Sequence, residues 1–109
     1  MLPNICAFRK TNHFLFRQWD RCINDTLLQE FMRNLPRHYN PKAKYNLVFS
    51  RSYCLTLIAK GFEVPKLNKN ECIILAIENF RLLTIYKYTS TDDLFVLLKA
   101  HRGEIFEII

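Results

Sequence analysis

The stretch Leu67–Leu98 reads LNKNECIILAIENFRLLTIYKYTSTDDLFVLL and is dense in apolar residues. Two polar segments, at residues 68–71 and 90–93, each lead into an apolar run. Asn and Ser side chains accept hydrogen bonds from the free backbone N–H groups at a helix start, where nearby carboxylates are also favoured. We therefore predict two core helices, over residues 70–80 and 91–101.

Outward from this stretch, the remaining elements are predicted from periodicity. Apolar residues recur every fourth position before Pro36, which predicts a helix over residues 24–35. Residues 45–58 mostly alternate between apolar and polar side chains, which favours two strands that turn near Ser50. One long helix over residues 42–60 is the alternative. Residues 82–88 fit a strand or a helix extension, and residues 104–109 fit a terminal strand.

These elements predict an α+β fold, a single domain over residues 1–109. We expect three or four helices and a short antiparallel sheet, with an all-α helical bundle as the alternative. A chain of 109 residues is the usual size of one domain. Half of its residues are hydrophobic, and this surplus of apolar surface predicts association with a second copy as a homodimer.

The cysteine pattern predicts a reducing compartment. The four cysteines are far apart in the sequence, and no pair has the Cys-x-x-Cys spacing of a zinc site. They are Cys6, Cys22, Cys54 and Cys72. We interpret them as reduced thiols packed in the core. No apolar run reaches the ~20 residues that a membrane span needs, so we predict a cytoplasmic protein with no membrane partner and no cofactor.

The net charge of +6 is concentrated in one part of the chain. Residues 31–62 contain six lysines and arginines and no acidic residue. Cations supply most sequence-independent affinity for nucleic acid, and tyrosines can stack on unpaired bases. The predicted nucleic-acid-binding residues are Arg33, Arg37, His38, Tyr39, Lys42, Lys44 and Arg51.

Two motifs in the second half of the chain carry a family resemblance. Leu67, Glu71 and Ile74-Leu75 match the pattern Leu-x-x-x-Glu-x-x-Leu-Leu, and Ser90 and Leu94 match a later Ser-x-x-x-Leu helix start. Together with the strand-like residues before them, they resemble the first part of a response-regulator-type winged-helix DNA-binding domain. The resemblance implies two helices and a DNA target. Eleven residues follow Leu98, too few for that family's recognition helix and wing, so no base-reading residue is carried over.

Catalytic motifs are not evident in the sequence. Arg33 and His38 have a spacing that some helical RNases use, but Pro36 between them would break the helix. We predict no catalytic residues and no enzyme activity. The predicted function is a small regulatory module that binds nucleic acid, most simply double-stranded DNA in transcription regulation. The alternative is an adaptor or inhibitor that binds an acidic partner protein.

Overall fold

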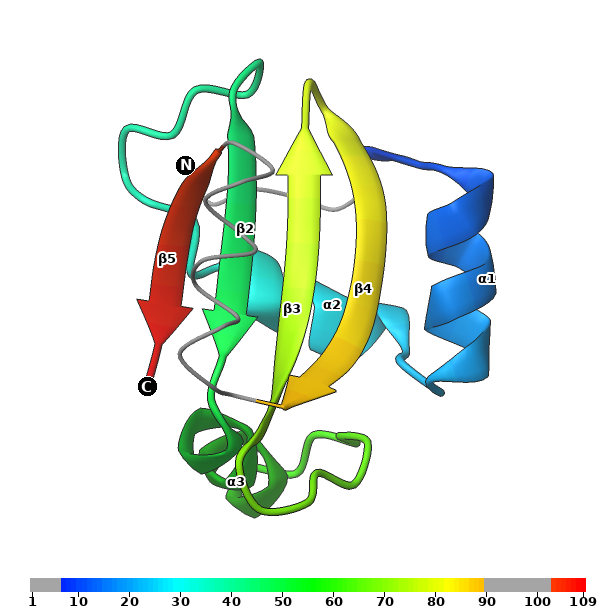
Figure 1. Ribbon diagram of the computed structural model, residues 1–109, viewed down its shortest axis with the longest axis vertical. Coiled ribbons are helices and arrows are strands. Elements are labelled where there is room, and N and C mark those ends of the chain that lie inside the picture. The colour runs from blue at the N-terminus through cyan, green and yellow to red at the C-terminus, as the bar shows by residue number, and fades with distance from the viewer. Residues whose placement is uncertain (1–6, 90–102) are drawn as a thin grey trace.

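The computed structural model describes residues 7–89 and 103–109. Within these residues the chain forms three helices and five strands, and the strands belong to one sheet (Figure 1). In chain order, the elements are β1 (Arg9–Lys10), α1 (Asn12–Asp20), α2 (Asp25–Met32), β2 (Lys44–Phe49), α3 (Arg51–Ala59), β3 (Glu71–Glu78), β4 (Arg81–Thr89) and β5 (Glu104–Ile108).

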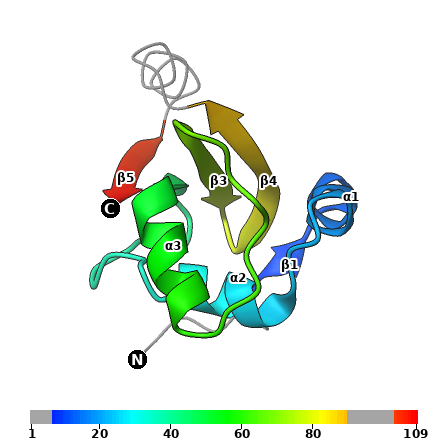
Figure 2. The ribbon, with the colours of Figure 1, turned by 90° about the horizontal axis from the view of Figure 1, so that it is seen from below.

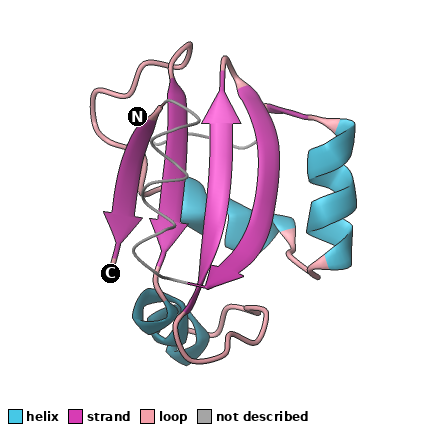
Figure 3. Ribbon diagram, viewed as in Figure 1, coloured by secondary structure: helices cyan, strands magenta, loops and turns pink. Residues whose placement is uncertain are grey.

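The sheet is mixed, with the strand order β1-β4-β3-β2-β5. β3 pairs antiparallel with both β2 and β4, whereas the outer strands β1 and β5 pair parallel with β4 and β2. The predicted fold class is therefore wrong: the architecture is α+β, but its sheet is a five-stranded mixed sheet and not a short antiparallel one. The helical bundle that we kept as an alternative is also excluded by this sheet (Figure 3).

The predicted helix over residues 70–80 is the main error, because these residues form β3. Every residue from Cys72 to Ile77 is buried, so the strand has no solvent-facing positions between its ends. A strand that is covered on both faces is a continuous apolar run, which periodicity alone cannot distinguish from a buried helix. The β-branched isoleucines of this run are compatible with the extended conformation.

A tight hairpin follows β3 and explains why the strand was missed. Asn79 and Phe80 connect β3 to β4, and both have positive φ angles, of 51° and 58°. Two positive φ angles are typical of the type I′ turns that join antiparallel strands, where Asn-Gly is the usual sequence. Phe80 in place of glycine removes the expected turn signal from the sequence.

The predicted pair of strands over residues 45–58 is also wrong, as is the single helix that was its alternative. The first half is β2, and the second half is α3. Ser50 is the N-cap of α3, and its Oγ accepts a hydrogen bond from the Tyr53 backbone N–H at 3.1 Å. The hydroxyl thus ends the strand and starts the helix, where we expected a turn between two strands.

Other predictions are closer to the structure. The helix predicted from residue 24 is α2, and Asn24 caps it by accepting a hydrogen bond from the Leu27 N–H at 2.8 Å, but the helix ends at Met32 rather than Leu35. The strand over residues 82–88 is confirmed as β4, and the terminal strand is confirmed as β5. The helix predicted over residues 91–101 lies outside the described residues.

The main core lies between the sheet and its helices. α2 and α3 are on the same side of the sheet, and α1 lies beside β4 (Figure 2). Phe31 of α2 stacks on Phe49 of β2 with 4.0 Å between ring centroids. The opposite sheet face carries a smaller buried cluster of Val48, Cys72 and Ile74. No helix among residues 7–89 and 103–109 is long and apolar enough to cross a membrane.

The central position of β3 predicts a large effect of truncating its core side chains. Leu75 is fully buried, so Leu75→Ala should lower the free energy of unfolding by ~2–5 kcal/mol. Leu55→Ala on α3 removes the same atoms from a side chain that is 47% exposed, and it should change stability by less than about 1 kcal/mol. Urea unfolding of both variants tests this difference. Equal stability of the two variants would show that β3 is not the core strand.

Candidate functional site

The predicted basic residues are placed at four different points of the fold: the loop after α2, the C-cap of α2, the start of β2 and the start of α3. Arg37, His38 and Lys42 are exposed in the loop between α2 and β2. Arg33 is the C-cap of α2, and its Nη1 lies 3.4 Å from Glu30 Oε2. The loop therefore presents three solvent-facing basic side chains, while the charge of Arg33 is partly offset by its neighbour.

The tyrosines of this region pack against other aromatic rings. Tyr39 is half-buried and packs against the rings of Phe8 and Tyr45, at centroid distances of 6.4 and 6.2 Å. Tyr45 is 4% exposed, and its hydroxyl accepts a hydrogen bond from the Asn40 N–H at 2.6 Å. Both rings hold the loop against β2, and the stacking role of Tyr39 stays a prediction.

Arg51 is separated from the other predicted residues by the length of β2. Lys44 begins this strand, and Arg51 begins α3 just after its far end. At ~3.3 Å per residue, the six residues between them correspond to about 20 Å. Arg51 Nε also donates a hydrogen bond to the Leu67 carbonyl at 3.3 Å. The predicted residues therefore do not form one surface.

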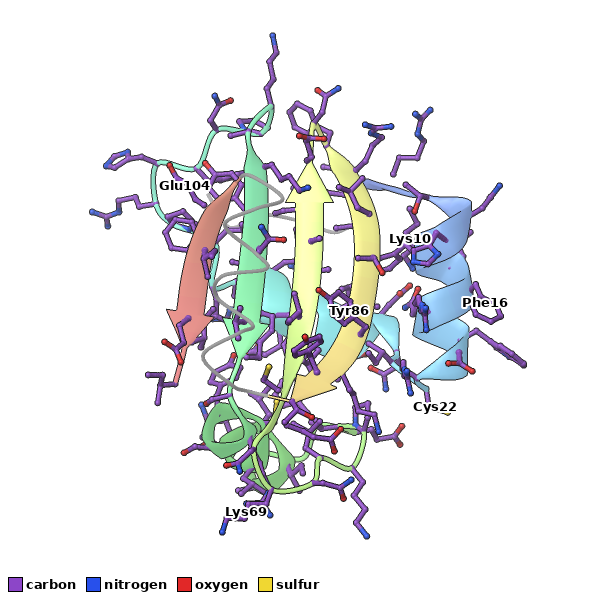
Figure 4. The ribbon with its side chains drawn as sticks, viewed as in Figure 1. Lys10, Phe16, Cys22, Lys69, Tyr86 and Glu104 are labelled. Atoms are coloured by element: carbon purple, nitrogen blue, oxygen red, sulfur yellow. The ribbon has the colours of Figure 1, made fainter. Side chains whose placement is uncertain are left out.

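A different set of basic residues lines a groove between α1 and β4. We call it the α1–β4 groove; it has a volume of about 390 Å³. Its lining residues are His13, Arg17 and Arg21 from α1 and its C-cap, with Thr84, Tyr86 and Lys87 from β4. Four of the six, His13, Arg17, Arg21 and Lys87, have basic side chains, and none has a carboxylate. Figure 4 labels Tyr86 on β4, where its ring packs against the smaller cluster of Val48, Cys72 and Ile74.

The helical repeat explains how α1 presents three of these side chains together. His13, Arg17 and Arg21 are four residues apart, so they lie along one side of a helix with 3.6 residues per turn. Phe14, the next residue after His13, is fully buried and fixes the orientation of the helix. The basic side therefore faces the edge of β4.

The start of α1 is hydrogen-bonded directly to β4. The backbone N–H of Thr11 donates to the Leu82 carbonyl at 3.1 Å, and its hydroxyl donates to the Leu83 carbonyl at 2.9 Å. The same hydroxyl oxygen accepts a hydrogen bond from the Phe14 N–H at 3.0 Å and caps the helix. One side chain thus sets both the start of α1 and its distance from β4.

A second connection holds α1 against α2. Asp25 Oδ1 accepts hydrogen bonds from Lys10 Nζ at 2.6 Å and from Gln18 Nε2 at 2.8 Å. The Lys10 hydrogen bond, followed by that of Gln18, holds the pKa of the Asp25 carboxyl below its usual value. Asp25 therefore remains ionised at neutral pH, and its charge is directed at Lys10 and not at the groove.

Several polar groups of the groove have free hydrogen-bonding capacity. Arg21 Nε is buried without a hydrogen-bond partner, and its nearest carboxylate oxygen, from Asp20, is 3.8 Å away. Burial raises the pKa of Tyr86, so its hydroxyl stays protonated and can donate a hydrogen bond at neutral pH. Lys87 Nζ makes one long bond of 3.4 Å to the Lys66 carbonyl. The groove is therefore suited to an anionic ligand.

Metal binding is not indicated in the described part of the chain. No group of three or more His, Cys, Asp or Glu side chains there is arranged to hold an ion. Cys54 and Cys72 are buried, and burial raises the pKa of each thiol to about 11, so both are neutral at physiological pH. Cys22 is exposed, which differs from the predicted packing.

The chain matches no protein-family model, no curated protein and no solved structure. The winged-helix resemblance therefore stays untested by these comparisons. The first of its two motifs falls on β3, where the resemblance implied a helix, and the second begins at Ser90, outside the described residues. The function of the chain is accordingly argued from its geometry.

The groove was missed because charge was compared between thirds of the chain. Residues 1–30 contain four lysines and arginines and three acids, so they looked nearly neutral. Two of these acids are occupied elsewhere: Asp25 binds Lys10, and Glu30 lies against Arg33. The spacing His13-x-x-x-Arg17-x-x-x-Arg21 was the available signal, because it places all three side chains on one side of a helix.

The two roles of Thr11 predict that its hydroxyl is needed to position α1. Thr11→Ala removes the helix cap and the bond to Leu83, and it should lower the free energy of unfolding by ~1–2 kcal/mol. It should also accelerate amide hydrogen exchange at Phe14, whose N–H loses its acceptor. Thr11→Ser keeps the hydroxyl and is the control, with exchange close to wild type. Unchanged Phe14 exchange in Thr11→Ala would contradict the proposed anchoring.

Proposed function

We propose that this protein binds nucleic acid by holding backbone phosphates in the α1–β4 groove. The observation that supports the proposal is the lining of the groove, where His13, Arg17, Arg21 and Lys87 are gathered with no acidic residue. Guanidinium groups suit phosphate because their planar N–H groups match two phosphate oxygens. Thr84 and the protonated Tyr86 hydroxyl add neutral hydrogen-bond donors.

The exposed loop cations could contribute to the same binding, but the proposal does not depend on them. Arg37, His38 and Lys42 point to solvent in a separate region, where cations of a surface loop also serve solubility. Their role in binding remains a prediction. The proposed role is binding without catalysis, in a cytoplasmic regulatory module. The sequence favours DNA as the target and transcription regulation as the process.

An acidic partner protein is the second candidate for the same groove. Arginine pairs with carboxylates as readily as with phosphates, so the lining residues alone fit both ligands. The two differ in their dependence on salt. Phosphate contacts release condensed counterions and give a steep, linear loss of log affinity with log salt concentration, whereas a protein interface of ordinary composition does not.

The groove predicts which arginines determine the salt dependence. The double variant Arg17→Gln/Arg21→Gln removes two charges and keeps polar side chains. Its oligonucleotide affinity should be weaker, and the slope of log affinity against log salt should be less steep by about 1.4–1.8, the value for two lost phosphate contacts. Fluorescence anisotropy of a labelled DNA oligonucleotide across a salt titration measures both quantities.

The matched control removes two charges from the loop. Arg37→Gln/Lys42→Gln has the same net charge as the groove variant, so it corrects for the overall electrostatic field of the protein. It should keep most of the wild-type slope. If the loop variant loses more affinity than the groove variant, the interface lies in the loop; if wild type binds no oligonucleotide at low salt, nucleic acid is not the ligand.

A further inference from the structure

Helix α1 exposes two aromatic rings on the side that faces away from the α1–β4 groove. Trp19 is 77% exposed and Phe16 is 55% exposed, and their ring centroids are 6.4 Å apart with an interplanar angle of 43°. Figure 4 shows Phe16 on the side of α1 that points away from the sheet. Neither ring belongs to the buried clusters of the described residues, so the core does not explain their presence.

The aromatic pair and the basic side belong to the same short helix. Trp19 lies between Arg17 and Arg21 in sequence, about 3 Å along the helix axis from each, but at ~100° per residue its side chain is about 200° around the helix from both. A ligand that uses both the groove and the rings must therefore pass round α1, a helix ~10–12 Å across, which requires a flexible strand. The arrangement combines a cationic track with aromatic faces, which is the usual construction of single-strand binding sites.

The base pairing of the ligand determines whether these rings can be used. In a duplex, each base is stacked between its neighbours and presents only its edges in the grooves. An unpaired base can turn its face outward and stack on Trp or Phe. Exposed rings on the far side of the helix that carries a phosphate site are therefore of use to a flexible single strand and of little use to a double helix.

The charges around the rings favour a polyanion over an apolar protein segment. Leu15, which is 48% exposed, is the aliphatic neighbour of the two rings on the exposed side of α1. The cations of the groove lie on the same helix, and the one acid at its C-terminal end, Asp20, is 3.8 Å from Arg21 and partly neutralises it. A ligand that contacts both sides of α1 must offer repeated negative charge and flat apolar groups.

We infer that the ligand of α1 is single-stranded nucleic acid, with phosphates in the α1–β4 groove and unpaired bases stacked on Phe16 and Trp19. This inference rests on the proposed function and specifies its substrate class. It differs from the double-stranded DNA that the sequence suggested. The binding energy then has two separable parts, a salt-dependent part from the groove and a part from stacking.

The single tryptophan of the chain makes the inference directly testable. Trp19 is the only tryptophan in the sequence, so the intrinsic fluorescence of the full-length protein reports on this ring alone. The probes are a dT12 oligonucleotide and a 12-base-pair dA·dT duplex. We expect dT12 to quench the fluorescence and to bind more tightly than the duplex, which should leave the emission nearly unchanged.

Two variants separate stacking from charge. Trp19→Leu should weaken dT12 binding by about tenfold, the usual loss for one base–aromatic stack, without changing the salt slope. Leu15→Ala is the control on the same exposed side of α1, and it should bind as wild type does because aliphatic contact is not required. Anisotropy of labelled dT12 is the readout for both.

The failures of the two proposals are distinguishable. If Trp19→Leu binds dT12 as well as wild type, with the salt slope still reduced in Arg17→Gln/Arg21→Gln, the stacking inference is overturned and the groove proposal stands. Equal or tighter binding of the duplex also overturns the inference. If Leu15→Ala loses as much affinity as Trp19→Leu, the surface is a general apolar contact and base stacking is wrong. If neither probe binds at low salt, both proposals fail.

Discussion

The structure depends on the burial of β3 on both faces. This strand is hydrogen-bonded to β2 on one side and β4 on the other, so both of its backbone edges are paired. Its side chains alternate between the main core and the smaller cluster that contains Cys72 and Ile74. A backbone that is removed from water on all sides must satisfy its N–H and C=O groups within the protein, and the sheet does this.

The same sheet creates the proposed site through β4. Among the described residues, β4 is paired with β3 along one edge, and at its other edge with β1 at the first two positions alone, Arg81 and Leu82. Thr11 then begins α1 beside the uncovered part of this edge. The groove is therefore the space between a short helix and a strand edge that a two-residue strand leaves uncovered. Its position follows from the topology and not from any local motif.

Whether a charged side chain can bind a ligand depends here on its nearest charged neighbours, and not on the net charge of its third of the chain. Asp25 neutralises Lys10 and positions Gln18, while Glu30 lies beside Arg33, so these acids do not offset the bases of the groove. The middle third has more net charge, but its cations are distributed between a loop and the far end of β2. Four basic side chains in one groove, of which Arg21 is partly neutralised by Asp20, are a stronger indication of an anion site than a larger number that are far apart.

The sequence by itself determined the elements whose signals are local. The Asn24 cap defined the start of α2, and alternation in residues 104–109 identified β5, because capping chemistry and side-chain period act within a few residues. Only the tertiary structure decided that Cys72–Ile77 is a strand, since two-sided burial removes the alternation. It also decided that Arg17 and Lys87, seventy residues apart, line one groove, because strand pairing sets which distant side chains meet.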